Sequence, residues 1–224
     1  MNKIIIASSK KWFFKTLKSN VFKNLDIEYI SCKKDFTIEN IDKLSPSYIF
    51  IPHWSWKIKS EIYKKYECIV FHTAPLPYGR GGSPIQNLIL NKFKESPLCA
   101  LKVSEEIDSG PIYCKSIISL EGNLSSILNR ISAEIQNMIL FIIKNNPKPS
   151  IQIGKIHHFK RLSIKDNELL MDMSLDDIYD RIRMVDSDDY DKAFIIFGKY
   201  KIEFKNAILD QNQIISDVKI FNLE

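Results

Sequence analysis

Two residues suited to proton transfer, His72 and Asp108, follow predicted strands in the middle of the chain. His72 comes directly after the apolar run 68–71, and Asp108 comes directly after the alternating segment 97–107. Ligands bind at the carboxyl ends of strands in a parallel α/β sheet, so two neighbouring strands would bring the imidazole and the carboxylate together. A carboxylate beside an imidazole orients the ring and stabilises its protonated form, as general acid–base catalysis requires. The alternative is that Asp108 caps a Ser-Gly turn and that His72 is an unrelated loop residue.

The segment that follows His72 is rich in glycine and proline and carries an ordered series of residues. It reads His-Thr-Ala-Pro-Leu-Pro-Tyr-Gly-Arg-Gly-Gly-Ser-Pro-Ile-Gln over 72–86, and an Asp-Ser-Gly turn occupies 108–110. This pattern resembles the signature of the folate-dependent formyltransferases, and the resemblance covers about residues 1–210. The matching residues are His72, Leu76, Pro77, Arg80, Gly81, Pro84, Gln86, Asp108 and Gly110. A later match places Arg183 on a helix that precedes Ala193-Phe194.

The resemblance implies an enzyme that transfers a formyl group from 10-formyltetrahydrofolate to an amine. It assigns catalysis to His72 and Asp108: the histidine meets the oxyanion or accepts the amine proton, and the aspartate orients the ring. A hydrogen-bond donor aimed at the developing oxyanion stabilises the transition state by about 3 kcal/mol. The family usually has an asparagine two residues before the histidine, where this chain has Val70. The side chains that are candidates to replace its amide are Asn87, Ser83 and His53.

The resemblance also implies that two loops bind the pterin of the folate, largely through backbone groups. The expected cofactor-binding residues are Trp54, Ser55, Trp56, Ser104, Glu105 and Ile107. The alternative for the two indoles is packing in the core or at its rim. The expected contacts to the acceptor substrate are Tyr78, Arg80 and Gly81. An arginine in a glycine-rich turn suits planar anions, and its alternative role is to shape the turn.

Two segments indicate the class of acceptor. Pro-His-Trp-Ser-Trp at 52–56 and Phe-His at 71–72 resemble the subset that formylates nucleotide-linked aminosugars, and also formylation domains attached to peptide synthetases. The expected partner is therefore a small-molecule amine, a nucleotide sugar used in surface glycan biosynthesis. One alternative is methionyl-tRNA formyltransferase, whose C-terminal barrel would need more than the about 55 residues that follow the linker. Another is a non-catalytic nucleotide-binding module.

The elements that must position these residues alternate between strand and helix. Mostly apolar segments predict strands at 3–8, 26–31, 47–52 and 68–71, and alternating segments predict strands at 97–107 and 111–120. Helical spacing predicts helices at 10–19, 58–66, 84–91 and 123–146, with Ser83 as the N-cap of the third. This alternation predicts an α/β fold with a Rossmann-like, mostly parallel sheet, which forms a catalytic domain over 1–165. Residues 166–224 are predicted to form a small α+β subdomain: a helix at 174–185, a hairpin around Gly198 and a last strand at 214–221.

Composition is that of an ordinary globular protein, with 45% hydrophobic and 26% charged residues. The net charge of +5 mildly favours anionic ligands, but the lysines are scattered, which argues against a nucleic-acid partner.

No apolar stretch is long enough for a membrane span or a secretory signal, so a cytoplasmic protein without membrane association is expected. The four cysteines form no C-x-x-C pair, so no metal is expected. The apolar strand 194–197 offers a surface for a homodimer.

Overall fold

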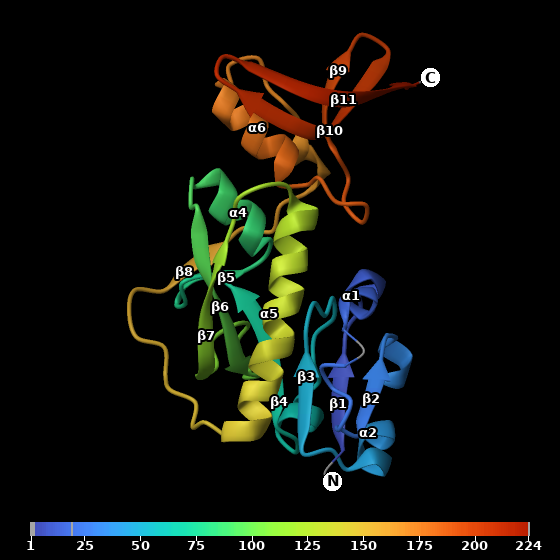
Figure 1. Cartoon of the computed structure of the whole chain (residues 1–224), viewed down its shortest axis with the longest axis vertical. Helices are drawn as coiled ribbons and strands as arrows, with labels where there is room; N and C mark the ends of the chain where they lie inside the picture. Colours follow the sequence, from blue (N-terminus) through green and yellow to red (C-terminus); the bar gives the residue numbers. More distant parts are fainter. Residues whose placement is uncertain (1–2, 19, 224) are drawn as a thin grey trace. The chain divides into compact units, whose positions relative to one another are not determined.

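The computed structural model describes residues 3–18 and 20–223, and the chain folds into two compact units (Figure 1). The first unit comprises Met1–Arg80, Pro97–Ile117 and Asn129–His157. The second unit comprises Gly81–Ser96, Ile118–Leu128 and His158–Glu224. The second unit therefore contains the predicted 166–224 subdomain together with segments from the middle of the chain. One reason is that helix α4 (Pro84–Leu90) packs against helix α6 (Leu175–Arg183).

A six-stranded sheet forms the core of the first unit. Its strands lie in the order β2 (Ile27–Ile30), β1 (Ile4–Ala7), β3 (Tyr48–Ile51), β4 (Cys68–Thr73), β6 (Glu95–Lys102) and β7 (Ile112–Ser119). Strands β2, β1, β3 and β4 run parallel, whereas β6 runs antiparallel to β4. Strand β1 is a continuous apolar run that is buried on both faces, as expected in a parallel sheet. The predicted α/β fold with a mostly parallel sheet is confirmed.

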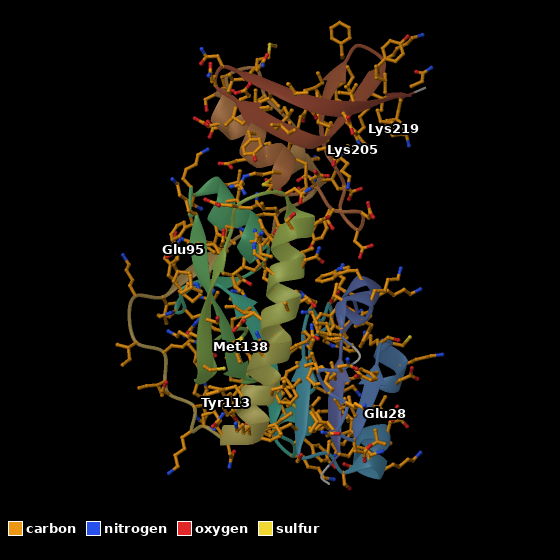
Figure 2. All side chains as sticks on the ribbon, in the orientation of Figure 1. Glu28, Glu95, Tyr113, Met138, Lys205 and Lys219 are labelled. Carbon is orange, nitrogen blue, oxygen red and sulfur yellow. The ribbon has the colours of Figure 1, made fainter. Side chains whose placement is uncertain are left out.

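Helices cover this sheet, and most of them occupy predicted positions. The helices of the first unit are α1 (Lys11–Thr16), α2 (Ile38–Leu44), α3 (Ser60–Tyr63) and most of α5 (Leu124–Asn145). Helix α5 runs along one face of the sheet, and Met138, labelled in Figure 2, is among its buried residues. The predicted end of the first helix, Ser19, lies outside the described residues, and α1 ends at Thr16. Helix α2 was not predicted; the side chain of Thr37 caps it by accepting a hydrogen bond from the Asn40 N–H.

The sheet face opposite α5 carries a group of buried apolar residues, which we call the loop-face cluster. Its members are Ile5, Ala7, Ile30, Phe36, Ile41, Ile49, Ile51, Ile62 and Cys68. Trp54, Val70 and Val103 pack against it from partly buried positions. Alternate residues of a strand point to the same face of a sheet, so His72 points to the same side as Cys68 and Val70.

The second unit contains a three-stranded antiparallel sheet and helices α4 and α6. The strands are β9 (Ala193–Phe197), β10 (Tyr200–Asp210) and β11 (Gln213–Asn222), in the order β11-β10-β9. The predicted hairpin around Gly198 is confirmed, and Gly198 has the positive φ of 57° that this turn requires. Ser174 caps α6 by accepting from the Asp177 N–H, as its sequence pattern predicts. Two short paired strands, β5 (Tyr78–Gly81) and β8 (His157–Phe159), were not predicted.

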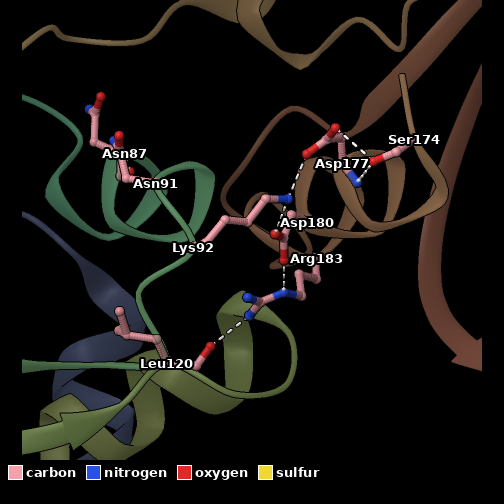
Figure 3. A network of polar contacts seen from close by, with 8 residues as sticks. All are labelled: Asn87, Asn91, Lys92, Leu120, Ser174, Asp177, Asp180 and Arg183. Atoms are coloured by element: carbon pink, nitrogen blue, oxygen red, sulfur yellow. Dashed lines mark hydrogen bonds and ion pairs between the residues drawn. The ribbon is translucent and has the colours of Figure 1, made fainter. Parts of the chain in front are cut away.

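Ion pairs hold α6 in place within the second unit (Figure 3). The Lys92 ammonium donates to Asp177 at 2.6 Å and to Asp180 at 2.9 Å, and the Arg183 Nε donates to Asp180 at 2.7 Å. The Arg183 Nη1 also donates to the Leu120 carbonyl at 2.6 Å. The side chains of Asp180 and Arg183 are nearly buried, so loss of one partner would leave an uncompensated charge. The arginine singled out by the family resemblance thus has a structural role.

Within the described part of the chain, no helix is long and apolar enough to cross a membrane. No group of three or more His, Cys, Asp and Glu side chains there could hold a metal ion. All four cysteines are free thiols. Burial raises the pKa of Cys68 to about 12 and that of Cys99 to about 11, so both thiols stay protonated at neutral pH.

Candidate active site

His72 and Asp108 lie in contact at the centre of the site. His72 Nδ1 is 3.3 Å from Asp108 Oδ2, and the two side chains are only 7% and 14% exposed. His72 Nε2 donates to the Gly79 carbonyl oxygen at 2.7 Å, since a carbonyl oxygen only accepts. The imidazole is therefore oriented through both nitrogens. With Nε2 as a donor, Nδ1 is the nitrogen that faces the Asp108 carboxylate.

The route by which the fold brings this pair together differs from the predicted one. His72 lies within β4 rather than after it, and β6 ends at Lys102, well before Asp108. Because β6 is antiparallel to β4, its carboxyl end lies beside Ile69 at the start of β4. Asp108 reaches the imidazole because the loop 103–111 passes over the sheet face toward which His72 points. The prediction that two parallel carboxyl ends would juxtapose the pair is wrong, although the contact itself forms.

The turn that carries Asp108 depends on the glycine two residues later. Asp108 has a φ of 55°, in the left-handed region that most residues avoid. A Cβ at Gly110 would lie 1.8 Å from the carbonyl oxygen of Lys102. The Lys102 N–H in turn donates to the Pro111 carbonyl at 2.9 Å. The Asp-x-Gly pattern therefore reflects a close approach of two backbone segments.

We expect Gly110→Ala to lower the free energy of unfolding by about 1–3 kcal/mol, because a rigid backbone atom occupies the space of the new Cβ. Urea unfolding of the purified variant measures this change. The control is Gly198→Ala, where an added Cβ meets nothing within 4 Å and only the positive φ opposes it. Equal stability of Gly110→Ala and the wild type would show that the turn does not need the glycine.

Arg80 is buried next to this turn and is joined to it by a glutamine. The Arg80 Nε and Nη2 donate to Gln152 Oε1 at 3.1 and 2.8 Å. Gln152 Nε2 donates to the carbonyl oxygens of Asp108 and Gly110 at 2.7 and 2.8 Å. Gln152 was not among the predicted site residues, because a polar residue in an irregular segment carries no periodic or motif signal. The expected contact of Arg80 with the acceptor stays a prediction.

The other two residues expected to contact the acceptor have contacts of their own. The Tyr78 ring stacks on His157 with 4.5 Å between the ring centroids. Gly81 lies in the second unit, has a φ of 103°, and would bring a Cβ to 3.0 Å from the Phe159 carbonyl oxygen. Packing against β8 therefore explains this glycine, and its role toward the acceptor stays a prediction.

The first loop expected to hold the folate follows β3 and contains two indoles. Trp54 is partly buried, with its ring 4.9 Å from that of Phe36 and 5.0 Å from that of Trp56. Trp56 is 38% exposed. The hydroxyls of Ser55 and Ser9 are 2.8 Å apart. Trp54 therefore packs at the rim of the core, and Trp56 presents an aromatic surface to solvent.

The second loop leads from β6 to Asp108. The Ser104 hydroxyl donates to the Glu106 carbonyl at 3.1 Å and Glu105 is exposed. Ile107 is 73% exposed. Because Val103 and Trp54 pack against the same loop-face cluster, both loops begin on one surface. Exposed aromatic and aliphatic side chains on two such loops fit a flat ring system bound by apolar contact and backbone groups.

Two of the three candidates to replace the family asparagine are already engaged in the second unit. Asn87 Nδ2 donates to the carbonyl oxygens of Gly82, Ser83 and Lys160 at 2.9–3.2 Å. The Ser83 hydroxyl accepts from the Leu162 N–H at 3.1 Å. Ser83 occupies the predicted N-cap position of α4, with Pro84 at the start of the helix, but its side chain makes no capping hydrogen bond. A tertiary contact takes the hydroxyl that the local pattern assigned to the helix.

The third candidate, His53, has a nitrogen available. Its Nε2 is buried and has no hydrogen-bond partner among the described residues. The His53 ring lies 4.8 Å from that of Trp12, and burial together with the charge of Lys10 lowers the pKa of His53 to about 4. The ring is therefore neutral at physiological pH. Val70, where the family has its asparagine, offers no donor and packs against the loop-face cluster.

A family model described as the C-terminal domain of methionyl-tRNA formyltransferase matches residues 164–221. The matched segment lies within the second unit and includes α6 and most of the three-stranded sheet. The segment was expected to be too short for a C-terminal barrel, and it forms a three-stranded sheet, but it still matches a C-terminal domain of this description. One helix and a three-stranded antiparallel sheet are thus enough to match this family model.

Two relatives illustrate the similarity of the chain to known proteins. The chain is 31% identical to a methionyl-tRNA formyltransferase of Campylobacter lari over 148 residues, which cover 65% of this chain and 45% of that protein. A solved structure described as methionyl-tRNA formyltransferase from Clostridium thermocellum is 39% identical, with a TM-score of 0.95. That match covers 99% of this chain and 100% of the other. The chain spans about half the length of the curated relatives it matches.

A more distant neighbour is the structure of HypX from Aquifex aeolicus in complex with tetrahydrofolic acid. It has a TM-score of 0.76 and 16% identity, and the match covers 92% of this chain and 38% of that chain. At this level of identity the likeness shows a shared fold.

Proposed function

The chain belongs to the formyltransferase family, and from this premise we propose that it transfers a formyl group from 10-formyltetrahydrofolate to an amine. The observation that carries the proposal is the buried contact between His72 and Asp108. Both residues stand at the motif positions that the family resemblance assigns to catalysis. The bound folate would supply the formyl carbon as the electrophile. Trp56 and Ile107 would hold its pterin, together with backbone groups of their loops.

Proton transfer is the task that the pair performs. When an amine attacks a formyl carbon, the amine loses a proton and the departing nitrogen gains one. His72 Nε2–H is engaged by the Gly79 carbonyl, so Nδ1 and the Asp108 carboxylate face each other and can share the proton taken from the amine. The carboxylate, the more exposed of the two groups, takes the proton from the amine and returns it to the leaving group. The imidazole shares the proton while it is held.

Stabilisation of the oxyanion falls to a different group because Val70 replaces the usual asparagine. We assign this role to the neutral His53 ring, whose Nε2 lacks a partner among the described residues. His53 follows β3, which pairs with the strand that contains His72. A neutral imidazole N–H is a suitable donor to a developing negative oxygen.

The names of the relatives favour methionyl-tRNA as the acceptor over a nucleotide-linked sugar. Both relatives with more than 30% identity described above are named methionyl-tRNA formyltransferases, and so is the family model over 164–221. We therefore propose methionyl-tRNA as the first acceptor to test, in place of the sugar that the 52–56 and 71–72 segments suggest.

A small amine is the second candidate, and the distribution of charge favours it. Residues 164–224 contain 8 Lys and Arg against 14 Asp and Glu, a net charge of −6. Residues 1–163 contain 24 Lys and Arg against 13 Asp and Glu, a net charge of +11. Binding of tRNA depends on cations that contact phosphates. An acidic C-terminal segment is poorly suited to that task, whereas the basic remainder also suits a nucleotide diphosphate.

Initial rates of formylation with methionyl-tRNA and with a panel of nucleotide-linked aminosugars separate the two acceptors. We expect methionyl-tRNA to be formylated, at a rate that falls steeply with added salt because phosphate contacts release counterions. The His72→Asn variant in the same assay controls for contaminating activity. Formylation of the sugars alone would show that the acceptor is a nucleotide-linked aminosugar and not methionyl-tRNA, and it would leave the proposed formyl-transfer reaction intact. Absence of transfer to every acceptor would contradict the proposed function.

A further inference from the structure

The side-chain amide of Gln152 is fully hydrogen-bonded at the site. A glutamine amide has two N–H donors and an oxygen with two lone pairs. Both donors are used by backbone carbonyls, at 2.7 Å to Asp108 and 2.8 Å to Gly110. The oxygen accepts twice from Arg80, at 3.1 Å from Nε and 2.8 Å from Nη2. A half-buried amide that is satisfied at every position has one well-defined orientation.

The partners of Gln152 belong to the two segments that carry the catalytic pair. Arg80 follows Gly79, whose carbonyl accepts from His72 Nε2. The other partners, Asp108 and Gly110, form the turn that presents the carboxylate to His72 Nδ1. Gln152 therefore connects the side chain of Arg80, the residue after Gly79, with the backbone of the turn that carries the carboxylate.

The Asp108 turn needs such support because its backbone is in an unfavourable conformation. The φ of Asp108 is 55°, and such conformations persist only where the surrounding structure holds them. The hydrogen bonds from Gln152 to the carbonyls of Asp108 and Gly110 fix the peptide groups on both sides of this turn. Small displacements of a catalytic group are costly: a shift of about 1 Å can reduce a rate about 100-fold.

We infer that Gln152 is a positioning residue for formyl transfer, holding Asp108 against His72 by bonding the turn to Arg80. This inference rests on the proposed function, and it goes beyond it by assigning a role to a residue outside the motif. Arg80 then acts within the protein, as the anchor of Gln152, in addition to any contact with the acceptor.

Two substitutions distinguish the hydrogen bonds of Gln152 to Arg80 from its hydrogen bonds to the turn that carries Asp108. Gln152→Met keeps the length of the side chain and removes all four hydrogen bonds. Gln152→Glu keeps an acceptor for Arg80 but loses the donors to the Asp108 and Gly110 carbonyls. The matched control is Gln136→Met, which removes another buried amide of the first unit, one that bonds to the Lys18 N–H and the Ser132 carbonyl.

We expect both Gln152 variants to lower kcat about 10- to 100-fold, with KM for the folate changed by less than about threefold. Gln136→Met should keep the wild-type kcat, even if it lowers the thermal unfolding temperature as much as the Gln152 variants do. Wild-type kcat in folded Gln152→Met would overturn the inference. Recovery of kcat by Gln152→Glu would show that anchoring of Arg80, and not of the turn, is what matters, and would also overturn it.

A measurement on the ligand-free protein tests the inference independently of the reaction. The NMR chemical shifts of the His72 imidazole nitrogens report the contact of Nδ1 with Asp108. We expect them to change in both Gln152 variants and to stay as in the wild type in Gln136→Met. Unchanged shifts in the Gln152 variants would contradict the positioning role. A wild-type protein without formyl transfer would contradict the proposed function, while these shifts would still decide whether Gln152 positions the pair.

Discussion

Replacement of His72 by asparagine is expected to lower kcat for formyl transfer by about 10²- to 10⁴-fold, the range of a lost acid–base group. Asparagine has a similar polar reach but cannot share and release a proton. Because the His72 ring contacts the Gly79 carbonyl and the Asp108 carboxylate from within β4, and asparagine can still form polar contacts there, the fold should tolerate the change. Steady-state kinetics at saturating folate, together with thermal unfolding, measure both effects.

The control for His72→Asn is His158→Asn, a change of an exposed histidine in β8. This variant should keep the wild-type kcat and unfolding temperature. Near-normal turnover in a folded His72→Asn protein would remove His72 from the mechanism.

Asp108→Asn is expected to lower kcat at least about 100-fold, with little change in folate binding. The substitution keeps the shape of the side chain and removes the charge that holds the proton with His72 Nδ1. Asparagine tolerates the left-handed conformation better than most residues, so the turn at a φ of 55° should persist. Binding of the folate by calorimetry and kcat by a formylation assay measure the two properties on one preparation.

The matched control for Asp108→Asn is Asp176→Asn, in the exposed first turn of α6. It should leave kcat unchanged. If Asp108→Asn unfolds the protein while Asp176→Asn does not, Asp108 is a structural turn residue, and the catalytic assignment fails.

The strands and the long helix could be predicted because their signals are local. Apolar runs mark β1, β3 and β4, and helical spacing marks α5. The direction of β6 could not be predicted, because a strand that alternates in polarity has the same pattern whether it pairs parallel or antiparallel. The placement of Asp108 depends on that direction, which explains why the pair was found by its motif and not by the predicted topology.

Residues that act through tertiary hydrogen bonds were beyond sequence reasoning. Ser83 before Pro84 has the pattern of an N-cap, but its hydroxyl accepts from Leu162 instead. Gln152 has no pattern at all, since its partners are backbone carbonyls and an arginine from distant segments. The small number of residues after the linker likewise did not predict the match of residues 164–221 to a C-terminal domain model.

The central claim is that this chain moves a formyl group by means of the His72–Asp108 pair. The most direct measurement incubates the wild type, His72→Asn and Asp108→Asn with 10-formyltetrahydrofolate labelled in its formyl carbon, and with methionyl-tRNA and aminosugar acceptors. We predict that the wild type places the label in an amide of one acceptor, and that the two folded variants do so at least about 100-fold more slowly. Absence of label from every acceptor with the wild type, or equal labelling by all three proteins, would contradict the claim.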